Sequence, residues 1–123
     1  DLQVAAALVS LELEDQQPQA AAAVYRSILR YYPGDLRIRN NIAMIQAQGG
    51  DFAGAIASLR QLLAEQPGYG SARVNLAQVL YRAGDRHAAI AELQRAQSAV
   101  AGTPLEAITR DQLAAWRGES SPQ

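Results

Sequence analysis

The sequence predicts an all-α protein built from repeated helical hairpins, and three observations lead to this prediction. Apolar residues recur at intervals of three and four, as they do along one face of a helix. The same residue types return at an offset of 34 positions, so that Gly50-Asp51 is repeated as Gly84-Asp85 and Pro33 as Pro67. A repeat of this length corresponds to one small unit stacked on the next. With 49% hydrophobic residues and a net charge of −1 over 123 residues, the composition excludes intrinsic disorder.

The offset divides the chain into three units, residues 2–35, 36–69 and 70–103. In the second unit, Ile38, Ile42 and Ile45 have helical spacing. Gly49-Gly50 should end that helix, since glycine adopts the left-handed conformation without a Cβ clash. Asp51 then caps the second helix by accepting a backbone N–H. Asp85 is expected to do the same in the third unit.

The two ends of the array carry different signals. The first unit has Gln16-Gln17-Pro18 in place of the Gly-Asp turn, and Pro18 is expected as a first helical residue. After the third unit, Thr103 and Glu106 are spaced as a capping box around Pro104. This pattern predicts a capping helix over residues 104–117 and a polar tail over 118–123. The face of that helix expected to cover the apolar end of the array consists of Leu105, Ile108, Leu113 and Trp116.

Units of 34 residues with small alanines at fixed places and a proline at the end resemble tetratricopeptide repeats. The resemblance covers residues 2–103 and is most specific in the second unit, which holds Phe52, Ala55, Leu59 and Pro67 where the family expects them. It implies a right-handed superhelix of three repeats whose first helices line a concave groove for a peptide or a partner helix. The chain departs from the family early in each first helix, where a large aromatic residue is usual and the residues here are Ala5, Arg39 and Arg73.

Residues off the apolar stripe of the first helices are our candidates for partner contacts. Asn41 and Asn75 share one repeat position, and side-chain amides suit an extended backbone because each both donates and accepts hydrogen bonds. The alternative is that these are ordinary solvated side chains. The candidate groove residues are Arg37, Asn40, Asn41, Met44, Gln48, Ser71, Val74, Asn75, Gln78, Tyr81 and Arg82.

The resemblance also bears on the class of peptide. Co-chaperones of the family bind the acidic C-terminus of heat-shock chaperones through Lys, Asn, Asn, Lys and Arg at five groove positions. Every positive charge of that set is missing here, which argues against this ligand. The residues at those positions are Ala6, Ser10, Asn41, Ser71 and Asn75.

Two other surfaces are candidates for interactions. Val4 and Leu11 occupy positions that pack on the preceding unit in the later repeats, so we expect further N-terminal repeats or a self-contact to cover them. Four arginines cluster in the sequence with only one carboxylate, Asp35, to oppose their charge. This local positive charge suits an anionic partner such as an acidic peptide or a polysaccharide. These arginines are Arg26, Arg30, Arg37 and Arg39. The neighbouring Tyr31-Tyr32 pair is expected to pack between units.

Composition excludes most catalytic chemistry. Cysteine is absent, and the single histidine, His87, is interpreted as a solvated surface residue. We therefore expect no enzyme activity, no metal and no cofactor. No stretch is long and apolar enough to insert into a membrane, and the near-neutral charge gives no broad basic surface for nucleic acid.

These observations predict a non-catalytic scaffold that binds a protein or peptide segment in its groove. The chain has arginine but no lysine, is rich in alanine and glutamine, and lacks cysteine. In these respects it is similar to the tetratricopeptide arrays of bacterial envelope machines. This similarity implies a periplasmic or envelope location and a role in secretion, outer-membrane assembly or exopolysaccharide export. Further repeats or a membrane-anchored domain of the same parent chain are then expected partners. The alternatives are a self-assembling segment of a longer array and a surface that binds anions or polysaccharide.

Overall fold

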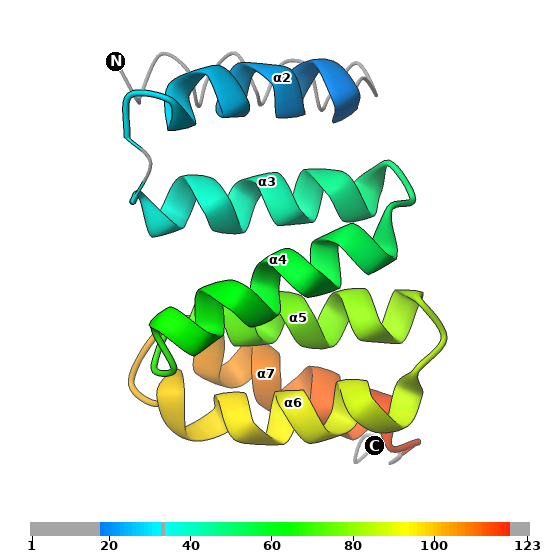
Figure 1. Cartoon of the computed structure of the whole chain (residues 1–123). Coiled ribbons are helices and arrows are strands. Elements are labelled where there is room, and N and C mark those ends of the chain that lie inside the picture. The colour runs from blue at the N-terminus through cyan, green and yellow to red at the C-terminus, as the bar shows by residue number, and fades with distance from the viewer. Residues whose placement is uncertain (1–17, 33, 119–123) are drawn as a thin grey trace. The chain divides into compact units, whose positions relative to one another are not determined.

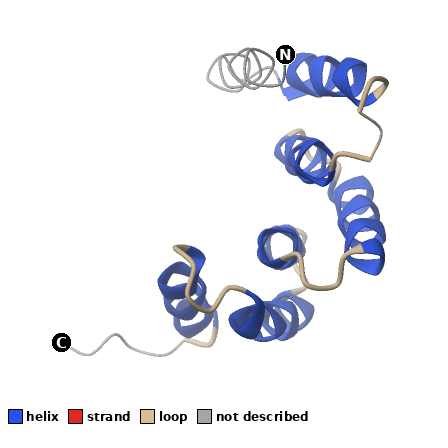
Figure 2. Cartoon of the chain, turned by 90° about the vertical axis from the view of Figure 1, so that its left-hand side faces the viewer, coloured by secondary structure: helices blue, strands red, loops and turns tan. Residues whose placement is uncertain are grey.

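The computed structural model describes residues 18–32 and 34–118. This part of the chain is α-helical and contains no strand, as the sequence predicts (Figures 1 and 2). The helices are α2 (Pro18–Leu29), α3 (Leu36–Gln48), α4 (Phe52–Glu65), α5 (Gly70–Arg82), α6 (Arg86–Ala99) and α7 (Leu105–Trp116). The chain divides into two compact units, residues 1–58 and 59–123, and the boundary lies inside α4. From here on, first unit and second unit mean these two compact units, and the 34-residue units of the sequence are called repeats.

The helices recur with the period of the sequence. The helices α3 and α5 begin 34 residues apart, and so do α4 and α6. The first helix expected for the first repeat lies outside the described residues, and α2, its second helix, is described from Pro18 onward.

The turns after α3 and α5 form as the sequence predicts. Gly50 and Gly84 have φ angles of 93° and 96°, in the left-handed region that residues with a Cβ avoid. The next residue in each case is an aspartate whose carboxylate accepts the backbone N–H three positions later. These hydrogen bonds measure 3.0 Å for Asp51 and 3.1 Å for Asp85. The repeated Gly-Asp pair therefore ends one helix and starts the next.

In the first unit, α2 packs against α3 (Figure 1). The core cluster of the unit joins Tyr25 of α2 to Ile38, Ile42 and Ile45 of α3, all of them buried. The isoleucines are spaced by four and three residues, which places them on one face of the helix. Burial of side chains of this size contributes about 1.5–3 kcal/mol each. Three partly buried residues of α2 pack against the cluster: Val24, Ile28 and Leu29.

In the second unit, α6 packs against both α5 and α7. The start of α5 comes so close to the end of α6 that position 70 has no room for a side chain. A Cβ on Gly70 would lie 2.8 Å from Cγ1 of the buried Val100, and 3.3 Å from the carbonyl oxygen of Ala99. The equivalent residue at the start of α3 is Leu36. The two repeats thus differ at a position where the close approach of Val100 and Ala99, and not the helix pattern, dictates the residue.

The capping helix occupies residues 105–116 of the predicted 104–117. Thr103 Oγ1 accepts the N–H of Leu105 at 3.2 Å, as the start signal predicts. The carboxylate of Glu106 reaches back as expected, but it accepts the N–H of Gly102 at 3.2 Å. The Thr103 N–H, its expected partner in a capping box, donates instead to a backbone carbonyl at 3.0 Å.

The buried face of α7 differs from the prediction at one residue. Ile108 was expected inside but is 54% exposed, whereas Thr109 is 1% exposed and buried along with Leu113 and Trp116. Spacings of four and three residues place these three side chains on one face. The Oγ1 atom of Thr109 has no hydrogen-bond partner among the described residues. Side-chain hydrophobicity favoured Ile108, but packing buries the face that holds Thr109.

Candidate partner-binding ridges

Two equivalent rows of side chains are exposed or half-buried on α3 and α5. In each row the residues are spaced by four, three and four, so they share one face of their helix. The α3 ridge belongs to the first unit and consists of Arg37, Asn41, Met44 and Gln48. The α5 ridge belongs to the second unit and consists of Ser71, Asn75, Gln78 and Arg82.

Two predicted groove residues are not open to a partner. Asn40 and Val74, which share a repeat position, are each 5% exposed. The prediction placed both residues off the apolar stripes of the first helices. The buried residues of α3 cover a wide arc instead, as expected of a helix in an array with neighbours on several sides. Asn40 and Val74 are therefore reassigned to the core.

Asn41 is held in place by the core of its own unit. Its Nδ2 donates a hydrogen bond of 3.3 Å to the hydroxyl of Tyr25, which is buried on α2. A side-chain amide has two donors and one acceptor, so this bond leaves hydrogen-bonding capacity for a partner. The amide is thus oriented before any partner arrives.

Tyr81, also a predicted groove residue, is committed to a contact within the second unit. Its ring stacks on Trp116 of α7, with the ring centroids 4.5 Å apart and the planes 5° from parallel. The guanidinium of Arg86, at the start of α6, donates to the main-chain carbonyl of the same tryptophan. Together these contacts hold the end of α7 against α5 and α6. Tyr81 remains exposed. Its position is explained by the stacking contact with Trp116 of α7.

The structure divides the predicted arginine patch. Arg26 of α2 and Arg30, which directly follows the end of α2, are both exposed. Arg37 is exposed, with its guanidinium 3.8 Å from the carboxylate of Asp35. Arg39 is half-buried and has an interaction of its own, so it does not belong to the exposed positive surface.

Tyr31 and Tyr32, expected to be packed between repeats, are 81% and 50% exposed. They follow the end of α2 and, with Ser27 and Ile28, line a hollow of about 360 Å³. The sequence pattern did not indicate this hollow, because tyrosines at a helix end are normally interpreted as packing residues.

Several other predictions concern metals, membranes and the N-terminus. The described residues contain no group of three His, Asp or Glu side chains arranged to hold a metal ion. None of their helices has the length and apolar character needed to cross a membrane. His87 is exposed, as expected. The apolar positions Val4 and Leu11 lie outside the described residues, and their role stays a prediction.

Sequence models of the tetratricopeptide repeat match residues 6–70 and 46–107. Each match spans at least half of the chain. The chain belongs to the tetratricopeptide repeat family. No curated protein matches its sequence.

Solved structures with a similar fold are available for comparison with this tetratricopeptide chain. The type III secretion translocator chaperone SycD of Yersinia enterocolitica has a TM-score of 0.77 at 18% identity, over 94% of this chain and 83% of its own. The TPR2B domain of yeast Sti1, in complex with pHsp70, has a TM-score of 0.78 at 20% identity, over 94% of both chains. PcrH, in complex with the chaperone binding region of PopD, has a TM-score of 0.78 at 16% identity, over 95% of this chain and 91% of its own. At these low sequence identities, the structural similarity shows a shared fold alone.

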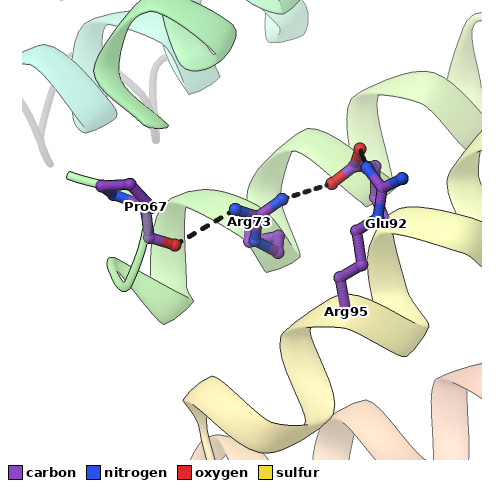
Figure 3. Close-up of polar contacts among 4 residues, drawn as sticks. All are labelled: Pro67, Arg73, Glu92 and Arg95. Carbon is purple, nitrogen blue, oxygen red and sulfur yellow. Dashed lines mark hydrogen bonds and ion pairs between the residues drawn. The ribbon is translucent and has the colours of Figure 1, made fainter. Parts of the chain in front are cut away.

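Arg73 marks where this chain departs from the usual tetratricopeptide pattern of a large aromatic residue. Its Nη1 lies 2.8 Å from Oε2 of Glu92 on α6, and its Nη2 donates to the carbonyl of Pro67 at 3.1 Å (Figure 3). Arg95 contacts the other carboxylate oxygen of Glu92 at 2.9 Å. An ion-pair network therefore links the loop before α5 to α5 and α6 in the second unit.

Proposed function

We propose that this chain is a non-catalytic scaffold that binds a segment of a partner protein through the α3 ridge and the α5 ridge. The observation that carries the proposal is the recurrence of one polar surface on both first helices. Asn41 and Asn75 occupy the same repeat position, and neither is buried. The residues one turn further on are Met44 and Gln78, which add an apolar contact and a second amide.

The chemistry of these ridges suits a peptide backbone. An extended segment presents N–H and C=O groups that need partners, and a side-chain amide satisfies both kinds. Asn41 is oriented by Tyr25, so less side-chain entropy is lost when a partner binds. The arginines Arg37 and Arg82 add positive charge at opposite ends of their helices.

Proteins with a similar fold support a protein segment as the ligand class. SycD has been solved with a peptide of the translocator YopD, PcrH with a region of PopD, and Sti1 with pHsp70. Of these ligands, the heat-shock type suits this chain least, because positions such as Ser71 and Asn75 lack the positive charges of that site. We propose a partner segment that is bound mainly through its backbone.

The proposed setting is a bacterial envelope assembly, with a role in secretion or exopolysaccharide export. Two observations support this setting: the chain contains arginine but no lysine, and its fold is similar to that of a type III secretion chaperone. In this proposal residues 2–35, 36–69 and 70–103 are the three repeats, and residues 104–117 cap them. Further repeats or a membrane-anchored domain of a parent chain would supply additional contacts.

The test is capture of partners from a bacterial envelope lysate with three forms of the protein. The ridge variant carries Ser71→Ala, Asn75→Ala and Gln78→Ala on α5. The control variant removes the same side-chain types, two amides and one hydroxyl, from exposed positions of α6: Gln94→Ala, Gln97→Ala and Ser98→Ala. Urea unfolding checks that all three forms are folded.

We expect a protein that the wild type and the control capture and the ridge variant loses. The matching set on α3, Asn41→Ala, Met44→Ala and Gln48→Ala, should lose the same protein. Equal capture by every form would show that the ridges do not bind the partner. Tyr81 is left unchanged, because its replacement would disturb the contact with Trp116.

A further inference from the structure

The hollow at the C-terminal end of α2 has the features of a small binding site. It measures about 360 Å³ and is lined by Ser27, Ile28, Tyr31 and Tyr32. This volume is near the lower end of the range of ligand pockets, about 300–1,000 Å³. The hollow therefore has room for one large side chain of a partner.

Its walls are largely apolar. The hydroxyl of Ser27 donates to the carbonyl of Ala23 at 3.1 Å, so it is satisfied within the helix. Ile28, which also lines the hollow, packs against the core cluster of the first unit. The tyrosine rings are left open to solvent, 81% and 50% exposed. Tyrosine is one of the residue types that carry most of the binding energy in protein interfaces.

The exposed charges next to the hollow in the sequence are positive, because they belong to Arg26 and Arg30. The nearest carboxylate along the described chain is Asp35. That carboxylate accepts the N–H groups of Arg37 and Ile38 at the start of α3. Arg26 lies in α2 and Arg30 directly after its last residue, so each is the sequence neighbour of a residue that lines the hollow. Both are exposed, and neither forms an ion pair with another described residue.

We propose that this hollow, with Arg26 and Arg30 beside it, binds an acidic peptide segment by a single aromatic or large aliphatic side chain. The side chain enters between Tyr31 and Tyr32, and flanking carboxylates pair with the two arginines. The occupant is a peptide because the hollow holds one side chain and the arginines are sequence neighbours of residues that line it, within reach of residues next to that anchor.

This site is separate from the ridges. It lies on the second helix of its repeat, whereas the α3 and α5 ridges lie on first helices. The proposal therefore does not depend on the scaffold function above, and separate variants test the two surfaces.

The probe is an array of nine-residue peptides of Glu and Asp with each amino acid in turn at the centre. A second array replaces every Glu by Gln and every Asp by Asn. The tightest binder is then titrated by fluorescence anisotropy against four proteins. They are the wild type, Tyr31→Ser with Tyr32→Ser, Arg26→Gln with Arg30→Gln, and the α5 ridge variant as control.

We expect the acidic peptides with a central Trp, Phe or Leu to bind, and their neutral counterparts to bind at least tenfold more weakly. The tyrosine variant should lose at least tenfold in affinity, and the ridge variant should bind like the wild type. Raising the salt from about 0.05 M to about 0.5 M should weaken wild-type binding much more than binding by the arginine variant.

Several results would overturn the proposal. One is equal binding of acidic and neutral peptides, and another is unchanged affinity after both tyrosines are replaced. Sedimentation could also show self-association of the wild type that the tyrosine variant abolishes. In that case a second copy of the chain fills the hollow and the peptide assignment is wrong. Because both tyrosines are exposed, their replacement should leave the unfolding midpoint unchanged, so a loss of binding can be assigned to the site.

Discussion

Replacing Arg73 by alanine should destabilise the second unit far more than replacing Arg95, although both arginines contact the same carboxylate. The side chains of Arg73 and Glu92 are only 17% and 13% exposed, whereas that of Arg95 is 67% exposed. Hydrogen bonds that involve a charged group contribute about 1.5–3 kcal/mol, and Arg73 makes two of them. An exposed ion pair contributes about 0.2–1 kcal/mol.

For Arg73→Ala we expect the free energy of unfolding to fall by about 2–3 kcal/mol. This is less than two full bonds, because Arg95 still neutralises Glu92 when Arg73 is gone. For Arg95→Ala we expect a loss of at most about 1 kcal/mol. Lysine at position 73 keeps the charge but cannot reach the carboxylate and the Pro67 carbonyl with one planar group, so its loss should be intermediate.

Urea unfolding followed by far-ultraviolet circular dichroism measures these differences, with the slope compared between variants to confirm that the same transition is seen. High salt should reduce the contribution of Arg95 more than that of Arg73, since screening acts mainly on exposed pairs. The reasoning is refuted if Arg73→Ala costs no more than Arg95→Ala. That result would mean that the ion-pair network in Figure 3 adds little to the stability that the packing of α5 on α6 provides.

Three further predictions concern the second unit. Asp85→Ala should lower stability by about 1 kcal/mol through loss of the α6 cap, and Asp85→Asn should restore most of it, so equal losses would contradict the capping role. A double-mutant cycle with Tyr81→Ala and Trp116→Ala should give a coupling of about 0.5–1.5 kcal/mol, and additive losses would exclude an energetic role for the stacked rings. Thr109→Val should raise the unfolding free energy by about 1 kcal/mol, because a buried hydroxyl without a partner is removed at nearly constant shape; a loss would reveal a hidden hydrogen bond.

Local signals in the sequence predicted most helix boundaries. Gly50, Gly84, Asp51 and Asp85 act through their own backbone and the next turn, so the residue type alone determines the outcome. The capping helix was found for the same reason. Its buried face was misjudged because burial depends on the rotation of α7 against α6, which no local rule supplies.

The candidate surface was harder to predict than the fold. Asn40 and Val74 are buried because of the neighbours that surround each first helix. The spacing of apolar residues along one helix does not tell how many such neighbours there are. Tyr31 and Tyr32 illustrate the opposite error, since apolar bulk predicted packing for side chains that are exposed. The repeat marks Asn41 and Asn75 as equivalent positions, and their contact with a partner stays a prediction.

Position 70 has no room for a side chain, and this limits which segments the repeats can exchange by recombination. Recombination between neighbouring repeats is a natural source of new arrays, and α3 and α5 have the same length. A crossover that copied α3 alone into the place of α5 would bring Leu36 to position 70, where even a Cβ would lie 2.8 Å from Cγ1 of Val100. Copying residues 36–69 over 70–103 would replace Val100 by the equivalent Gln66 in the same event. Of these two exchanges, only the one that moves a whole hairpin also replaces Val100, the residue nearest to a side chain at position 70.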